Sequence, residues 1–171
     1  MLPYHKIVLP SGLRVIVVPM KYTSTITSVV FVKTGSRYER KEENGISHVL
    51  EHLFFQGTKK RPNKQMVKRE LDRIGSESNA FTSQDHTAYY VKTDSRYLDL
   101  SLDILADMYC NALFRSSDIE KARRVVVEEI RMYLDMPQRQ VADYFYSLLY
   151  SGNSLGWPIA GPIKTVLSLE R

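Results

Sequence analysis

The sequence predicts an α+β fold in which a mostly antiparallel sheet packs against several helices. Segments rich in β-branched residues come first, amphipathic helical segments are interspersed later, and short turn segments separate neighbouring strands. With 171 residues, 43% of them hydrophobic, the chain can bury one core but has little material for a second. We therefore expect residues 1–171 to form a single domain.

The predicted strands are rich in Val, Ile and Thr and are bounded by turn residues. Pro10-Ser11-Gly12 separates the first two strands, Thr34-Gly35-Ser36 ends the third, and residues 83–86 join the last two. The predicted ranges are Ile7–Leu9, Leu13–Val18, Ser24–Lys33, Glu77–Thr82 and Thr87–Thr93.

The predicted helices are delimited by capping residues, glycine and proline. Asn44 can cap the first helix, which runs to about Gln56 and is closed by Gly57. The second helix stops at Gly75, and Pro137 separates the fourth helix from the fifth. The later predicted ranges are Asn63–Ile74, Tyr97–Leu113, Ser117–Asp135 and Gln138–Leu149, and Ile163–Leu169 begins a further helix.

The chain is mildly basic but lacks the pattern typical of nucleic-acid binding. Its formal net charge is +5, from 24 Lys and Arg against 19 Asp and Glu. The basic runs Lys59–Arg61 and Arg123–Arg124 form no stripe with aromatic platforms, so we interpret them as solvated surface. No membrane partner is expected either, because no segment approaches about 18 uninterrupted apolar residues.

Cysteine usage and the N-terminal residues indicate a reducing compartment. Cys110 is the only cysteine, so no internal disulfide can form. The first residues lack the long apolar stretch of a signal peptide. We expect a cytoplasmic protein, or an organelle-matrix form whose presequence is absent.

His48, Glu51 and His52 carry the clearest chemical pattern. On a helix, positions i, i+3 and i+4 share one face, so both imidazoles and the carboxylate lie together. Two neutral imidazoles one turn apart can bind Zn²⁺, and the carboxylate can take a proton from zinc-bound water, whose pKa falls to about 7. The opposite face is apolar and comprises Ile46, Val49, Leu50, Leu53 and Phe54.

A catalytic zinc needs a third protein ligand, and the helix phase selects Glu129. Glu129 falls on the apolar side of its helix, where burying an isolated carboxylate costs free energy unless a cation binds it. Its neighbour Glu128 falls on the opposite, charged side and is interpreted as solvated. The apolar side is formed by Ile119, Ala122, Val126, Ile130 and Tyr133.

Residues Gly45–Thr58 resemble the signature of the pitrilysin or insulinase family of zinc peptidases, known as M16. This family includes the mitochondrial processing peptidases and insulin-degrading enzyme, and its motif H-x-x-E-H is the inverse of the commoner H-E-x-x-H. The resemblance spans nearly the whole chain. It continues through Arg61-Pro62, Ile74–Ser76, Asn79–Ser83, Tyr89-Tyr90, Val125–Ile130 and Leu155–Gly161.

The resemblance implies a zinc-dependent metalloendopeptidase with a LuxS-like or processing-peptidase-like metallohydrolase architecture. It implies that His48, His52 and Glu129 are the zinc ligands. It further implies that Glu51 is the general base, so that zinc-activated water hydrolyses the peptide bond.

For the substrate, the resemblance implies an extended peptide or an unfolded polypeptide. The segment Asn79-Ala80-Phe81 corresponds to an edge strand that pairs with the peptide backbone. Phe55 lies on the same helix face as Glu51 and either walls the pocket beside the scissile bond or packs beneath the strands.

Two features depart from the family pattern. Family members usually carry a second Glu two turns before the ligand Glu, and this position is Ala122; losing such a carboxylate typically lowers metal affinity or activity about 10–100-fold. Family catalytic domains also continue beyond this C-terminus, and a second, related half closes over the site. We therefore interpret the chain as a partial N-terminal catalytic domain that acts with a second M16-type half or as a homo-oligomer.

Two other functions fit parts of the sequence. The first is a catalytically weak or inactive subunit that binds peptides, which Ala122 favours and the intact His48–His52 motif opposes. The second is a lyase acting on ribosylhomocysteine, which also uses H-x-x-E-H but with a cysteine as third ligand. Cys110 is the only candidate for that ligand.

The expected surroundings of His86 and of four C-terminal aromatic side chains do not follow from the histidine motif. His86 is expected to lie in a solvated turn rather than at the metal. A cluster near the C-terminus forms either a partner-binding patch or part of the core, and comprises Tyr144, Phe145, Tyr146 and Tyr150.

Overall fold

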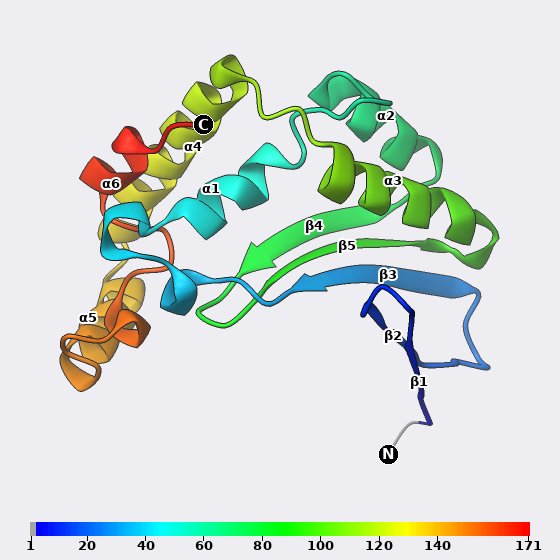
Figure 1. Ribbon diagram of the computed structural model, residues 1–171, viewed down its shortest axis with the longest axis horizontal. Coiled ribbons are helices and arrows are strands. Elements are labelled where there is room, and N and C mark those ends of the chain that lie inside the picture. The colour runs from blue at the N-terminus through cyan, green and yellow to red at the C-terminus, as the bar shows by residue number, and fades with distance from the viewer. Residues whose placement is uncertain (1–2) are drawn as a thin grey trace.

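The computed structural model describes residues 3–171 and has the predicted α+β architecture (Figure 1). Two antiparallel sheets are present in this part of the chain: a hairpin of β1 and β2, and a three-stranded sheet in the order β3-β5-β4. Each predicted strand is found within two residues of its expected ends. The strands are β1 (His5–Val8), β2 (Arg14–Val17), β3 (Thr25–Val32), β4 (Glu77–Thr82) and β5 (Thr87–Asp94).

The helices lie mostly on one side of the three-stranded sheet. Figure 1 shows α1, α2 and α3 over one face, the β1–β2 hairpin on the other side, and α4 running beside α1 and α6. The helices are α1 (Ile46–Leu53), α2 (Lys64–Arg73), α3 (Leu98–Asn111), α4 (Ser116–Leu134), α5 (Pro137–Leu149) and α6 (Ile163–Ser168). Within residues 3–171, none of them is both long and apolar enough to cross a membrane.

Two buried clusters hold α1 in place. The first lies between α1, α4 and α6 and comprises Val49, Leu53, Ile119, Ala122, Val126, Val127, Val166 and Leu169. The second lies between the sheet, α2 and α3 and comprises Val67, Leu71, Ala80, Tyr89, Val91, Ile104, Leu105 and Met108. Helix α1 packs between these clusters, so its polar face is directed at the space between α4 and β4.

The predicted cap of α1 is wrong, because Asn44 does not accept a hydrogen bond from the helix. Gly45 adopts a φ of 102° and occupies the N-cap position, which places Asn44 outside the helix. The carboxylate of Glu39 accepts hydrogen bonds from the backbone N–H groups of Gly45 and Ser47, both at 2.8 Å. The Glu39 carboxylate, which belongs to the loop before α1, thus accepts hydrogen bonds from the free N–H groups at this helix end. The helix also ends at Leu53, before the predicted Gln56.

Helix α5 contacts α4 and residues 154–156, but its side chains are mostly exposed in the described part of the chain. None of its residues is buried. The C-terminal aromatic cluster is therefore exposed in the described residues, and both of its interpretations, a partner-binding patch and part of the core of a longer domain, stay predictions. Its exposed residues are Tyr144, Phe145, Tyr146 and Tyr150.

The basic run at residues 59–61 is not uniformly solvated, because Arg61 is buried with only 4% of its surface exposed. Its guanidinium donates to Glu70 at 2.9 Å, to Asp103 at 2.8 Å and to Asp107 at 2.9 Å. Thr58 also donates to Asp107. This network joins the loop after α1 to α2 and α3.

We expect the substitution Arg61→Met to lower the free energy of unfolding by about 3–5 kcal/mol, because it leaves buried carboxylate without its cation. The matched control is Arg96→Met, since Arg96 pairs with Asp94 through a side chain that is 77% exposed. We expect the control to cost less than about 1 kcal/mol. Urea unfolding measures both changes, and equal losses would contradict the assigned role of Arg61.

The same network predicts a pH dependence. Burial alone would raise the pKa of Asp107, but hydrogen bonds from Thr58, Arg61 and Asn111 outweigh it and hold that pKa below its usual value. The stabilisation is therefore complete above the unfolded-state pKa of about 4 and is lost as the pH falls below it. We expect the stability gap between the wild-type protein and Arg61→Met to narrow below about pH 4. If the difference in unfolding free energy between the two proteins does not change with pH, the assigned role of Asp107 is contradicted.

Candidate active site

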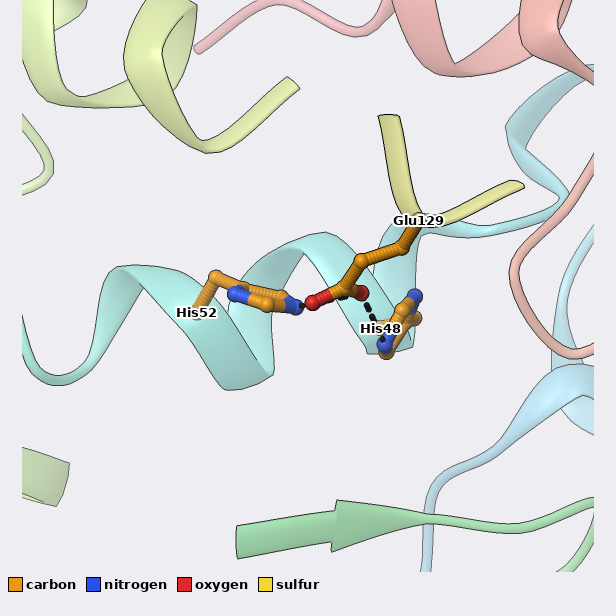
Figure 2. Close-up of side chains that lie close together, drawn as sticks. All are labelled: His48, His52 and Glu129. Carbon is orange, nitrogen blue, oxygen red and sulfur yellow. Dashed lines mark ion pairs between the residues drawn. The ribbon is translucent and has the colours of Figure 1, made fainter. Parts of the chain in front are cut away.

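Three side chains from two helices converge on one point (Figure 2). His48 and His52 project from successive turns of α1, and Glu129 of α4 reaches between the two imidazoles. The Nε2 atom of His48 lies 3.5 Å from Oε2 of Glu129, and the Nε2 atom of His52 lies 3.3 Å from the same oxygen. One nitrogen or oxygen atom from each side chain lies within 4.8 Å of the other two.

The surroundings of the two ring nitrogens suit metal binding. Burial, and to a smaller extent the nearby His52, lower the pKa of His48 to about 4, so its imidazole is neutral at pH 7. The Nε2 atom of His52 is buried and, although it lies 3.3 Å from Oε2 of Glu129, it makes no well-aligned hydrogen bond in the described structure. Buried polar atoms in native proteins are usually paired, so this nitrogen indicates a ligand at this position.

The spacing of the three side chains fits zinc. Ligands about 2.0–2.1 Å from a tetrahedral zinc ion lie about 3.3–3.4 Å from one another. The observed separations of 3.3 and 3.5 Å between Glu129 and the two histidines agree with that geometry. Two imidazoles and one carboxylate also match the donor set of catalytic zinc sites, which keep one position open.

Glu129 and Glu128 occupy different environments, as their helix phases predict. The Glu128 side chain is 69% exposed and pairs with Arg131 at 2.7 Å. The Glu129 side chain is only 30% exposed and faces α1. It is half-buried rather than fully buried, because it lies at the border of the apolar stripe that packs α4 against α1.

Glu51 lies beside the three converging side chains but is not one of them. It accepts a hydrogen bond on Oε2 from the hydroxyl of Thr82, the last residue of β4. Burial raises the pKa of Glu51, and the hydrogen bond from Thr82 opposes this shift only in part. A carboxylate whose pKa is raised toward neutrality is suited to accepting and returning a proton.

A cleft of about 1030 Å³ opens next to these residues. His48 and Glu51 form part of its floor, and the end of β4 contributes Ala80, Phe81 and Thr82. The remaining walls come from the C-terminal end of α4, from α5 and from residues 156–163. The cleft is large enough for several residues of an extended chain.

The other residues singled out from the sequence lie outside the three-residue cluster. Phe55 packs against Tyr89 and the core between the sheet and α3, and is not among the residues that line the cleft. His86 is half-buried against Phe31 and Phe81 rather than solvated. Cys110 is exposed on α3, away from the two histidines, which argues against the lyase-like ligand set.

Glu39 and Thr82 also contribute to the candidate site but were not predicted from the sequence. Glu39 caps α1 from a different segment, and no local pattern in the sequence points to it. Thr82 shares a strand face with Ala80, so strand alternation could have placed it toward α1.

Two glycines bring the wall of the cleft against the first turn of α1. Gly161 has a φ of 74°, and a Cβ atom on it would lie 2.1 Å from the carbonyl oxygen of Asn44. Gly45 has a φ of 102°, and a Cβ atom there would lie 2.5 Å from the carbonyl oxygen of Ala160. The backbones therefore touch at a distance that only glycine permits.

We expect Gly161→Ala to weaken both the fold and the metal site, because the new methyl group must push α1 away from the loop. Gly152→Ala is the matched control, since Gly152 has nearly the same φ of 77° but open space around its Cβ position. Both variants place alanine at a positive φ and so carry the same backbone strain. Only Gly161→Ala adds a collision with the Asn44 carbonyl, which should lower the free energy of unfolding by about 1–3 kcal/mol more. Unfolding experiments and zinc titrations measure the difference; equal effects in the two variants would contradict the contact.

The family model of insulinase, peptidase family M16, matches residues 14–163. The chain belongs to this family. The resemblance inferred from its histidine motif is thereby confirmed, and zinc, the cofactor expected from that motif, is the metal of the M16 peptidases.

Relatives and solved structures of M16 proteins extend over most of the chain. An uncharacterized zinc protease of Bacillus subtilis, YmxG, is 39% identical over 160 residues, which cover 94% of this chain and 39% of that protein. The mitochondrial-processing peptidase subunit beta of Caenorhabditis elegans is 37% identical, covering 95% of this chain and 35% of that protein. The structure of a protease from Helicobacter pylori superposes with a TM-score of 0.93 at 32% identity, covering 99% of this chain and 41% of that one. The chain thus spans about two fifths of the length of these three proteins.

Proposed function

We propose that this chain carries the zinc-binding and catalytic residues of a metalloendopeptidase. His48, His52 and Glu129 hold the zinc ion, and Glu51 is the general base. The convergence of two imidazoles and one carboxylate at zinc-like spacing carries this proposal. Membership of the M16 family supports it.

The protein residues supply positioning and proton transfer. A zinc ion held by His48, His52 and Glu129 would supply Lewis-acid chemistry, which activates water and polarises the carbonyl of the scissile bond. Glu51 takes the proton of the attacking water and passes it to the leaving amine, which requires a carboxylate that is neither a ligand nor fully solvated. Its place beside the histidines and its raised pKa meet both requirements.

The substrate of this proposed reaction is an extended peptide that adds a strand to β4. In the described sheet β4 pairs only with β5, so its other edge is free. The backbone N–H of Ala80 donates a hydrogen bond to the side-chain oxygen of Asn79 at 2.9 Å. The carbonyl oxygen of an incoming peptide can replace the Asn79 oxygen as the acceptor. Ala80 and Phe81 also line the cleft beside Glu51. An unfolded polypeptide offers the extended backbone that this edge requires.

A zinc-dependent cleavage assay tests the proposal. The protein is stripped with a chelator, reloaded with zinc and incubated with a fluorogenic extended peptide, alone and with a second M16-type half. We expect cleavage to disappear on stripping and to return with zinc. Cleavage that is indifferent to zinc would contradict the proposal.

A non-catalytic peptide-binding subunit is the second candidate function, and Ala122 favours it. Ala122 is 1% exposed and lies in the apolar cluster between α1 and α4, where family members usually carry a second Glu. No carboxylate from this position supports Glu129. Bound zinc and bound peptide without cleavage, even with a second half present, would favour this alternative.

A further inference from the structure

Thr82 connects two parts of the candidate site that are distant in the sequence. Its hydroxyl donates a hydrogen bond to Oε2 of Glu51, which lies 31 positions earlier on α1. Both side chains are half-buried and line the same cleft. In residues 3–171 this is the only hydrogen bond that the Glu51 carboxylate makes.

The position of Thr82 is fixed by the hairpin that follows it. The N–H of Ser83 donates to the carbonyl of His86 at 2.9 Å, and the Ser83 hydroxyl accepts from the N–H of His86 at 3.1 Å. The loop after β3 holds this hairpin in turn, since the N–H of Arg37 donates to the carbonyl of Gln84 at 3.1 Å. Threonine is β-branched and has few side-chain rotamers, so its hydroxyl is presented in a fixed direction.

The bond leaves the carboxylate free to react. A carboxylate has two oxygens with about four acceptor positions, and the hydroxyl of Thr82 occupies one of them, on Oε2. Within residues 3–171 no hydrogen bond engages Oε1 of Glu51, and Glu51 is one of the residues that line the cleft. A hydroxyl donor therefore restrains the long Glu51 side chain without occupying both of its oxygens.

We propose that Thr82 is the positioning residue of the general base, and that it couples the bound peptide to proton transfer. The inference rests on the proposed function, because it assigns a role in the same reaction. Thr82 belongs to β4, the strand to which the peptide is proposed to add. One strand thus sets both the register of the peptide and the orientation of the Glu51 carboxylate.

The test compares Thr82→Val, which keeps the shape but removes the donor, with Thr82→Ser, which keeps the donor. Thr25→Val is the matched control, because Thr25 is exposed at the start of β3. We expect Thr82→Val to lower kcat about 10- to 100-fold at unchanged KM and zinc content, as for other partners that orient reactive groups. Thr82→Ser should recover most of kcat, and Thr25→Val should match the wild-type protein.

The outcomes separate this inference from the proposed function. An unchanged kcat in Thr82→Val overturns the positioning role, while the proposed function stands if Glu51→Gln is inactive. An equal loss of kcat in Thr82→Val and Thr82→Ser, or a loss of bound zinc in Thr82→Val, shows that Thr82 has a structural role. Either result also overturns the positioning role. If the wild-type protein cleaves nothing, the proposed function fails, and crystal structures decide the inference. A Glu51 carboxylate displaced in Thr82→Val alone supports it, and an unmoved carboxylate overturns it.

Discussion

Glu51→Gln should lower peptide cleavage by about 10²- to 10⁴-fold while leaving zinc bound, because general base catalysis typically contributes a factor of this size. The amide has the shape of the carboxylate but cannot accept the proton of the attacking water. Glu51 is not part of the three-residue cluster, so its replacement leaves the metal ligands in place. Cleavage rates with a fluorogenic peptide and zinc content per chain measure the two effects.

The control for this prediction is Glu42→Gln, which changes the same functional group at an exposed position. It should retain both zinc and cleavage. Two results contradict the assignment of Glu51: cleavage that survives the substitution, or zinc that is lost with it. The second result would mean that Glu51 is a ligand rather than a base.

Glu129→Ala should weaken zinc binding by more than about 100-fold, because the loss of a direct ligand exceeds the 10- to 100-fold cost of losing an outer partner. Glu128→Ala is the natural control, since the two residues are neighbours on α4 with the same functional group. Within residues 3–171, the one ion pair of Glu128 is with Arg131 at the surface, so its loss should leave zinc affinity unchanged.

Competition with a chromogenic chelator measures both affinities. Equal zinc affinities in Glu129→Ala and Glu128→Ala would contradict the choice of Glu129. If only Glu128→Ala loses zinc, the orientation of α4, in which Glu129 faces α1 and Glu128 faces solvent, is also contradicted. The unfolding midpoints of both variants, recorded without zinc, separate ligand loss from unfolding.

The residues of the candidate site that follow a helical period were predictable from the sequence. His48, Glu51 and His52 share a face because of their spacing on α1, and the apolar stripe of α4 distinguishes Glu129 from Glu128. Strand and helix ranges also followed from β-branched segments, glycine and proline. These features depend on residues that are close to one another in the sequence, so they can be predicted from local spacing and residue type.

The remaining features depend on contacts between distant segments. Glu39 caps α1 in place of Asn44 because Gly45 takes a left-handed conformation against residues 160–161. Arg61 is buried because three carboxylates from α2 and α3 surround it. Neither partner set can be identified from local periodicity, since each is decided by how the helices pack.

Anomalous scattering at the zinc absorption edge, measured on crystals of the zinc-loaded protein, tests the central claim most directly. We expect one strong peak between α1 and α4, with nitrogen atoms of His48 and His52 and an oxygen of Glu129 about 2.0–2.2 Å away. Glu51 should lie outside this shell and remain bonded to Thr82. A peak elsewhere, or a Glu129 carboxylate turned away from the ion, would contradict the proposed zinc site.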